Sequence, residues 1–103
     1  MQFSVRFSDD SEEDLYQIGA WLGAKAGVDV ARRFVDQIIF TCERLASHPF
    51  AGSPRDDIAP GLRSKSYRRR TTIFYSIIDS EVTVIHILYG GRDVNRAFGL
   101  TPQ

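Results

Sequence analysis

The sequence has little cysteine and no long apolar run. One of its 103 residues, Cys42, is a cysteine, so no disulfide can form within the chain and nothing points to an oxidising compartment. No stretch approaches the roughly 20 consecutive apolar residues of a membrane-spanning helix. The basic start and apolar run of a secretory signal are missing from the first ten residues, MQFSVRFSDD. We therefore expect a cytoplasmic protein that does not span a membrane.

Motifs for metal, nucleotide or cofactor chemistry are missing as well. His48 and His86 have no cysteine, histidine or carboxylate at the spacing of metal ligands, and we interpret them as a helix cap and a partly buried strand residue. Gly90-Gly91 indicates the end of a strand rather than a phosphate-binding loop. Cys42 lies on the apolar stripe of a predicted helix, where a thiol is an inert part of the core. We expect no metal and no cofactor.

An excess of either charge is also missing, because 13 Lys and Arg balance 13 Asp and Glu. A neutral chain is not attracted to nucleic acid as a whole, so we expect no direct sequence-specific nucleic-acid binding. The bases concentrate in one stretch without acids: Arg63, Lys65, Arg68, Arg69 and Arg70. Two interpretations stay open, a solvated sheet edge that resists aggregation and a surface that docks carboxylates or phosphates.

The composition, 43% hydrophobic and 25% charged, is typical of a folded domain. We assign one domain to residues 1–103, with its core from about 2 to 98. Residues 2–7 alternate between polar and apolar and predict a strand. The acid-rich stretch 8–14 predicts the start of a helix, which should run to about Ala24.

A second helix should follow after a very short link. Gly27 closes the first helix, and apolar residues then recur at helical spacing from Val28 to about Ser47. Pro49 ends this helix because proline lacks the amide hydrogen and crowds the preceding turn. The short link predicts an antiparallel helical hairpin, and turn residues predict a loop over residues 50–61.

The second half of the chain is rich in strand-forming residues. We predict strands over 62–67, 71–78 and 82–89, a tight turn at 79–80 and a terminal helical turn over 93–98. The last strand is apolar on both faces and should lie inside the sheet. The order is β-α-α-β-β-β, an α+β fold in which a helical hairpin packs on a small, mainly antiparallel sheet.

The basic stretch from Arg63 to Arg70 is also interpreted as the first strand of the hairpin, continued past the regular strand pattern over 62–67. In an extended strand Arg63, Lys65, Tyr67 and Arg69 share one face. Arg68 and Arg70 then lie on the other face.

Several segments in this order resemble the ParE branch of the ParE/RelE toxin superfamily. They are the Asp14-Leu15 helix start, the stretch from Leu45 to Gly52 that is similar to "L-A-x-x-P-x-x-G", the approach Gly61-Leu62-Arg63-Ser64, and the closing strands Ile73-Phe74-Tyr75 and Ile87 to Asp93. The similarity covers about residues 2–98. Two places differ from the family pattern: Tyr89 replaces the more frequent histidine, and residues 68–70 replace a glycine or proline, which leaves the shape of the hairpin open.

The resemblance implies the toxin of a type II toxin–antitoxin module, neutralised by a ParD-like antitoxin whose C-terminal segment wraps around it. ParE proteins inhibit DNA gyrase, whereas RelE relatives cut messenger RNA on the ribosome. Arg92-Asp93 follows the ParE pattern, and the tail from Phe98 onward has no Tyr or His. We therefore expect a gyrase inhibitor that is not an enzyme. An mRNA endoribonuclease and a non-toxic, antitoxin-binding homologue are the alternatives.

Three sets of candidate site residues follow from these arguments. The set expected to bind the antitoxin is Arg63, Lys65, Arg68, Arg69, Arg70, Trp21 and Phe34. The set for target binding is Arg92, Asp93, Arg96 and Phe98, although Arg92-Asp93 is also explained as a structural ion pair. A ribonuclease would use Arg63, Lys65, Tyr75 and Arg92, because such side chains stabilise phosphorane charge and move protons without a metal.

Overall fold

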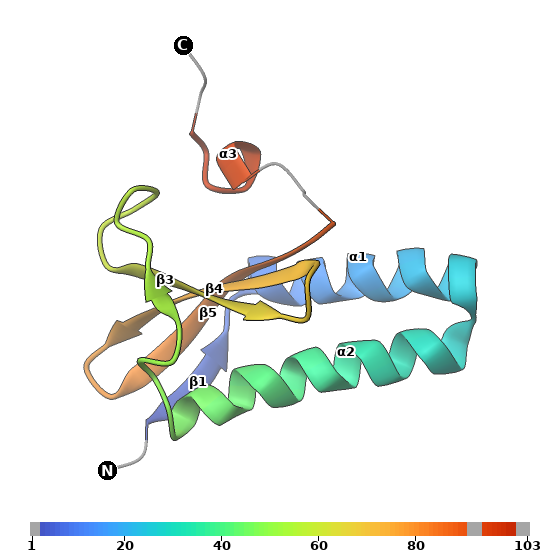
Figure 1. Cartoon of the computed structure of the whole chain (residues 1–103), viewed down its shortest axis with the longest axis horizontal. Coiled ribbons are helices and arrows are strands. Elements are labelled where there is room, and N and C mark those ends of the chain that lie inside the picture. Colours follow the sequence, from blue (N-terminus) through green and yellow to red (C-terminus); the bar gives the residue numbers. More distant parts are fainter. Residues whose placement is uncertain (1–2, 91–93, 101–103) are drawn as a thin grey trace.

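The computed structural model describes residues 3–90 and 94–100 (Figure 1). The elements are β1 (Ser4–Phe7), α1 (Asp9–Ala26), α2 (Val28–Glu43), the 3-10 turn η1 (Arg44–Ala46), β2 (Ser53–Pro54), β3 (Leu62–Tyr67), β4 (Thr71–Ile78), β5 (Glu81–Tyr89) and α3 (Val94–Ala97). The predicted α+β fold is confirmed. None of the helices in the described part of the chain is long and apolar enough to cross a membrane.

The sheet has five strands in the order β1-β5-β4-β3-β2. β1 pairs with β5 in parallel, and the other neighbours are antiparallel. β5 therefore lies inside the sheet, as its two apolar faces predict. The short strand β2 lies within the stretch predicted as loop, because two residues carry no periodic pattern. Its proline stands at a sheet edge, the place where a missing amide hydrogen costs no ladder bond.

The two helices begin and end on identifiable local signals. The Ser8 hydroxyl accepts a hydrogen bond from the amide of Ser11 at 3.0 Å and caps α1. Gly27, at φ 100°, separates α1 from α2 in a backbone conformation that favours glycine. α2 ends at Glu43 and tightens into the η1 turn instead of continuing to Ser47 as predicted. Tightening of this kind is common at the end of a helix.

The hydrophobic core lies between the helical hairpin and one face of the sheet. It contains Ile38 and Cys42 from α2 and Tyr75 from β4, all with no exposed surface. Burial raises the pKa of the Cys42 thiol to about 12, with a smaller contribution from the charge of Glu43. The cysteine is thus the inert core residue that the sequence predicts.

The β3–β4 turn differs from the prediction. Tyr67 pairs with Thr71, so Arg68, Arg69 and Arg70 form the turn instead of extending β3. The expected distribution of these arginines over two strand faces is therefore wrong. Arg68 adopts φ 55°, and this left-handed conformation closes the hairpin without a glycine at a cost of about 1 kcal/mol.

Candidate functional site

The β3–β4 turn is an exposed and strongly basic surface. It projects along the helical hairpin toward the link between α1 and α2, away from the β4–β5 turn (Figure 1). The Arg68 guanidinium lies over the Tyr67 ring at 5.6 Å, and its Nε donates to the Tyr67 hydroxyl at 3.2 Å. The side chains of Arg69 and Arg70 form no hydrogen bond or ion pair with the described residues. Their charge is therefore available to a partner.

A basic groove lies beside the turn, between α2 and β3, with a volume of about 530 Å³. Its lining is Gln37, Phe40, Thr41, Arg44, Leu45, His48, Ala51, Lys65, Ser66, Tyr67 and Arg68. Three of these side chains are permanent cations and none is an acid. Such a groove fits an extended anionic segment, and Phe40, which is 55% exposed, offers it an apolar contact.

Four aromatic rings connect the helices to the end of the sheet. Trp21 of α1 contacts Tyr89 at 5.3 Å between ring centroids, and Phe34 of α2 contacts both Tyr89 at 5.6 Å and Tyr67 at 5.8 Å. Trp21 and Phe34 are thereby brought next to the basic turn. These two candidate antitoxin residues and the turn arginines therefore lie on neighbouring surfaces.

Arg63 and Tyr75 have a different place from the other candidate residues. The buried Tyr75 hydroxyl donates to the Pro49 carbonyl at 2.8 Å and accepts from the Gly52 amide at 3.0 Å. Nη2 of Arg63 donates to the carbonyls of Gly52 at 2.6 Å and Phe50 at 3.3 Å. These contacts, which we call the loop tie, fasten residues 49–52 to the sheet. Three segments that carried the family resemblance, 45–52, 61–64 and 73–75, meet there.

The predicted target-binding residues lie near the C-terminal end. Arg92 and Asp93 fall outside the described residues. Arg96 is exposed on α3. The Phe98 ring packs on Phe74 and on His86, with centroids 5.1 Å apart in both cases, and so anchors this segment on the sheet face away from the core.

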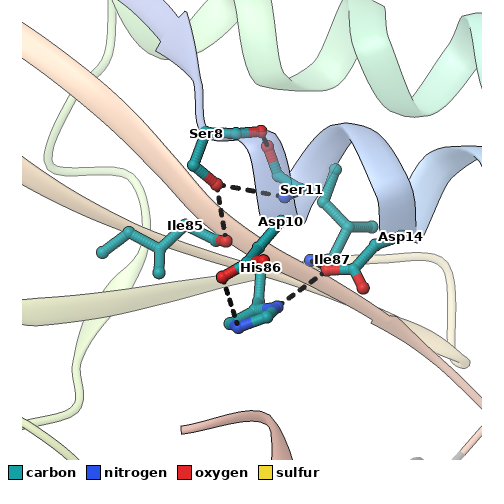
Figure 2. Close-up of polar contacts among 7 residues, drawn as sticks. All are labelled: Ser8, Asp10, Ser11, Asp14, Ile85, His86 and Ile87. Carbon is teal, nitrogen blue, oxygen red and sulfur yellow. Dashed lines mark hydrogen bonds and ion pairs between the residues drawn. The ribbon is translucent and has the colours of Figure 1, made fainter.

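An acid–histidine network at the start of α1 escaped the sequence reasoning (Figure 2). One oxygen of Asp14, Oδ2, accepts from the Ile87 amide at 2.9 Å and lies 2.9 Å from Nδ1 of His86. Because a carboxylate only accepts, Nδ1 carries the proton. The Ser8 hydroxyl donates to the Ile85 carbonyl at 2.8 Å. These bonds fasten α1 to the edge of β5 beyond the end of β1.

This network is structural in its geometry. His86 is 12% exposed at its side chain and is covered by Phe98, and Asp10 is 3.8 Å from its other nitrogen. The Ser8 hydroxyl is already engaged as donor to Ile85 and as acceptor from Ser11. The described part of the chain brings together no group of three histidine, cysteine or acidic side chains that could hold a metal ion. The one feature of the sequence that points to this network is the Asp14-Leu15 pair, which is part of the family resemblance.

Replacing Asp14 by alanine is expected to lower the free energy of unfolding by about 2 kcal/mol. The substitution leaves the Ile87 amide and Nδ1 of His86 without their acceptor, and an unsatisfied buried donor costs roughly 1–3 kcal/mol. Chemical denaturation would measure the change. The matched control is Asp10→Ala on the same helix, whose 76% exposed carboxylate should contribute less than about 1 kcal/mol. Equal effects of the two substitutions would refute a structural role for the network.

Comparison with known proteins gives a consistent family and fold. A family model described as "ParE toxin of type II toxin-antitoxin system, parDE" matches residues 5–94. None of the curated proteins matches the sequence significantly. Similar solved structures include the chromosomal ParDE toxin–antitoxin system from P. aeruginosa, with a TM-score of 0.76 and 20% identity over 85% of this chain and 96% of that one.

Two RelE-type structures share the same fold. The toxin–antitoxin complex RelBE2 from Mycobacterium tuberculosis has a TM-score of 0.67 and 18% identity, over 87% of this chain and 100% of that one. A mutant of the E. coli toxin RelE in the free state has a TM-score of 0.65 and 14% identity, over 96% of this chain and 93% of that one. At these identities the likeness shows the fold alone.

Proposed function

Because the chain belongs to the ParE toxin family of type II toxin–antitoxin systems, we propose that it inhibits DNA gyrase by binding and that a ParD-like antitoxin neutralises it. Gyrase inhibition and antitoxin binding would both depend on surface contacts, and the chain itself would catalyse no covalent reaction. Net neutrality with a local basic surface suits protein partners better than nucleic acid as a whole.

The observation that carries the proposal is the loop tie. A metal-free ribonuclease built from Arg63, Lys65 and Tyr75 needs their polar atoms in one open site. Tyr75 has no exposed surface, and both roles of its hydroxyl are taken by Pro49 and Gly52. Nη2 of Arg63 donates to two backbone carbonyls, which holds the guanidinium against the loop. These contacts support a binding mechanism over cleavage.

The helical hairpin supports the antitoxin half of the proposal. An open, mainly apolar groove of about 630 Å³ runs between α1 and α2, lined by Leu15, Tyr16, Gly19, Ala20, Gly23, Val28, Ala31, Arg32 and Val35. Small side chains along it leave room for the apolar face of a partner helix. An amphipathic antitoxin helix would cover this groove, including the exposed side chains of Tyr16 and Val28 that line it.

The edge of β3 offers a second mode of contact. β2 pairs only with Arg63 and Ser64, so no described strand covers the Lys65–Tyr67 part of that edge. An extended segment of the antitoxin can add a strand there. Acidic side chains on such a strand would meet the basic groove and the turn arginines.

One observation favours ribonuclease activity as a second candidate. The basic groove is open, and its Lys65, Arg44 and His48 side chains suit a phosphate backbone. The same fold occurs in RelE, and ribonuclease activity through this groove is therefore the second candidate.

The two candidates separate on expression of the chain alone in bacterial cells. Gyrase inhibition predicts growth arrest with induction of a DNA-damage reporter and intact messages. Ribonuclease activity predicts arrest with mapped cleavage of messages and no damage signal. Co-expression of the protein encoded by the neighbouring reading frame should restore growth. Message cleavage that is lost in Lys65→Ala would contradict the proposal.

A further inference from the structure

A small cavity opens between α1, the end of β5 and the β3–β4 turn. Its volume is about 230 Å³, and its lining is Ile18, Trp21, Arg70, Tyr89 and Gly90. Small-molecule sites usually measure about 300–1,000 Å³, so this cavity fits one side chain of a partner better than a free ligand. Ile18 is buried at 5% exposure, whereas Trp21 is 42% exposed and open to contact.

The cavity has an apolar interior and a cationic rim. Trp21 and Tyr89 stand at 53° to each other with centroids 5.3 Å apart, so the rings form two walls that meet at an angle. Nζ of Lys25 lies 5.3 Å from the centroid of the Trp21 ring. Arg70 adds a second cation, and the described residues that line the cavity include no acid.

The backbone holds this rim in place while the Arg70 guanidinium stays available. The Gly90 amide donates to the Arg70 carbonyl at 2.9 Å, which fastens the turn to the end of β5. The Arg70 side chain is exposed and has no hydrogen bond or ion pair with any described residue. A guanidinium that has no partner among the described residues is matched best by a carboxylate, which it can bind through two parallel hydrogen bonds.

We propose that this cavity is the anchor site of the antitoxin: it takes one leucine-, isoleucine- or phenylalanine-sized side chain, and a neighbouring carboxylate of the same acidic segment pairs with Arg70. The inference rests on the proposed function, since it names the point where neutralisation is strongest. The residues that contribute most of the binding energy of a protein interface are often tryptophan, tyrosine or arginine and cluster in well-packed pockets.

The ring geometry favours a peptide over single-stranded nucleic acid. Bases stack on open, flat aromatic faces. Here the Trp21 ring has Lys25 near one side and Tyr89 tilted against it, and the edge of Phe34 packs against Tyr89 at 84°. No pair of parallel open faces remains among these rings.

The test measures the affinity of the purified chain for the protein encoded by the neighbouring reading frame, by isothermal titration calorimetry. Trp21→Ala should weaken binding by about 30-fold, while Trp21→Phe should keep most of it. Arg70→Gln should weaken binding several-fold and reduce its salt dependence. The matched control is Ile78→Ala, an exposed apolar residue at the opposite turn of the sheet, which should bind as the wild type does. Thermal melts of all variants confirm that each one is folded.

The outcomes distinguish the anchor site from the function on which it rests. Binding that persists unchanged in Trp21→Ala and Arg70→Gln overturns the anchor site and leaves the proposed function standing. A wild-type chain that does not bind the neighbouring protein overturns both. Tight binding of a dT20 oligonucleotide that is lost in Trp21→Ala also overturns the anchor site, since the cavity would then serve nucleic acid.

Discussion

Replacing Gly52 by alanine should lower the free energy of unfolding by about 3–5 kcal/mol. A Cβ at this position would lie 2.5 Å from the Ser64 carbonyl oxygen and 2.8 Å from the Tyr75 hydroxyl. Because the Ser64 oxygen belongs to the backbone of β3, either this paired strand must shift or the loop that contains Gly52 must move away from the sheet. Overpacking costs roughly 1–3 kcal/mol, and each buried group that loses its partner adds about 1–3 kcal/mol. In a domain of this size the melting temperature should fall by about 15 °C or more.

Two further variants identify the loop tie as the cause. Tyr75→Phe keeps the ring but leaves the Gly52 amide and the Pro49 carbonyl without partners, and should cost about 2 kcal/mol. Gly23→Ala is the matched control: its Cβ would meet only the Ala31 Cβ, at 3.8 Å. Alanine in a helix should raise stability by about 0.5–1 kcal/mol there. Gly52→Ala with wild-type stability would contradict the geometry of the loop.

Changing Arg68, Arg69 and Arg70 together to glutamate should weaken antitoxin binding on the order of 100-fold. Each exposed ion pair contributes about 0.2–1 kcal/mol, and charge reversal adds repulsion to the lost attraction, so three changes sum to about 3 kcal/mol, which corresponds to that factor. The difference from wild type should shrink at high salt, because the charges are exposed. Binding assays at several ionic strengths measure both effects.

A graded series separates charge from fold at this turn. The triple glutamine variant removes the positive charge and has the same size as the glutamate variant without its negative charge, so its affinity should lie between those of the wild type and the glutamate variant. Arg68→Gly should raise stability, by up to about 1 kcal/mol, because glycine adopts φ 55° without strain. The same affinity across the whole series would contradict a role of the turn in antitoxin binding and would leave it as a solvent-exposed hairpin turn.

The sequence predicts a helix or strand of this fold well where the residues follow a single periodic pattern. The regular strands predicted over 62–67 and 71–78 agree with the bounds of β3 and β4, and β5 begins one residue earlier than predicted. The expected continuation of the first hairpin strand to Arg70 is wrong, because arginines carry no turn signal. Only the pairing of Tyr67 with Thr71 leaves three residues to close the hairpin.

The site depends more on contacts between distant residues, which a single sequence does not reveal. Asp14 and His86 are 72 positions apart, and nothing in either neighbourhood indicates that they meet. Tyr75 has the right chemistry for catalysis, but its position between Pro49 and Gly52 follows only from the fold. Trp21 and Phe34 lie next to the basic turn through their contacts with Tyr89 and Tyr67, and their role in antitoxin binding stays a prediction.

The most direct test of a gyrase-binding toxin is a supercoiling assay with purified components. Gyrase, relaxed plasmid and this chain are mixed, with and without the protein of the neighbouring reading frame. Gyrase inhibition predicts loss of supercoiling and accumulation of cleaved plasmid with the chain alone, and recovery when the partner is added. Unchanged supercoiling by a folded chain that stops growth in cells would contradict it.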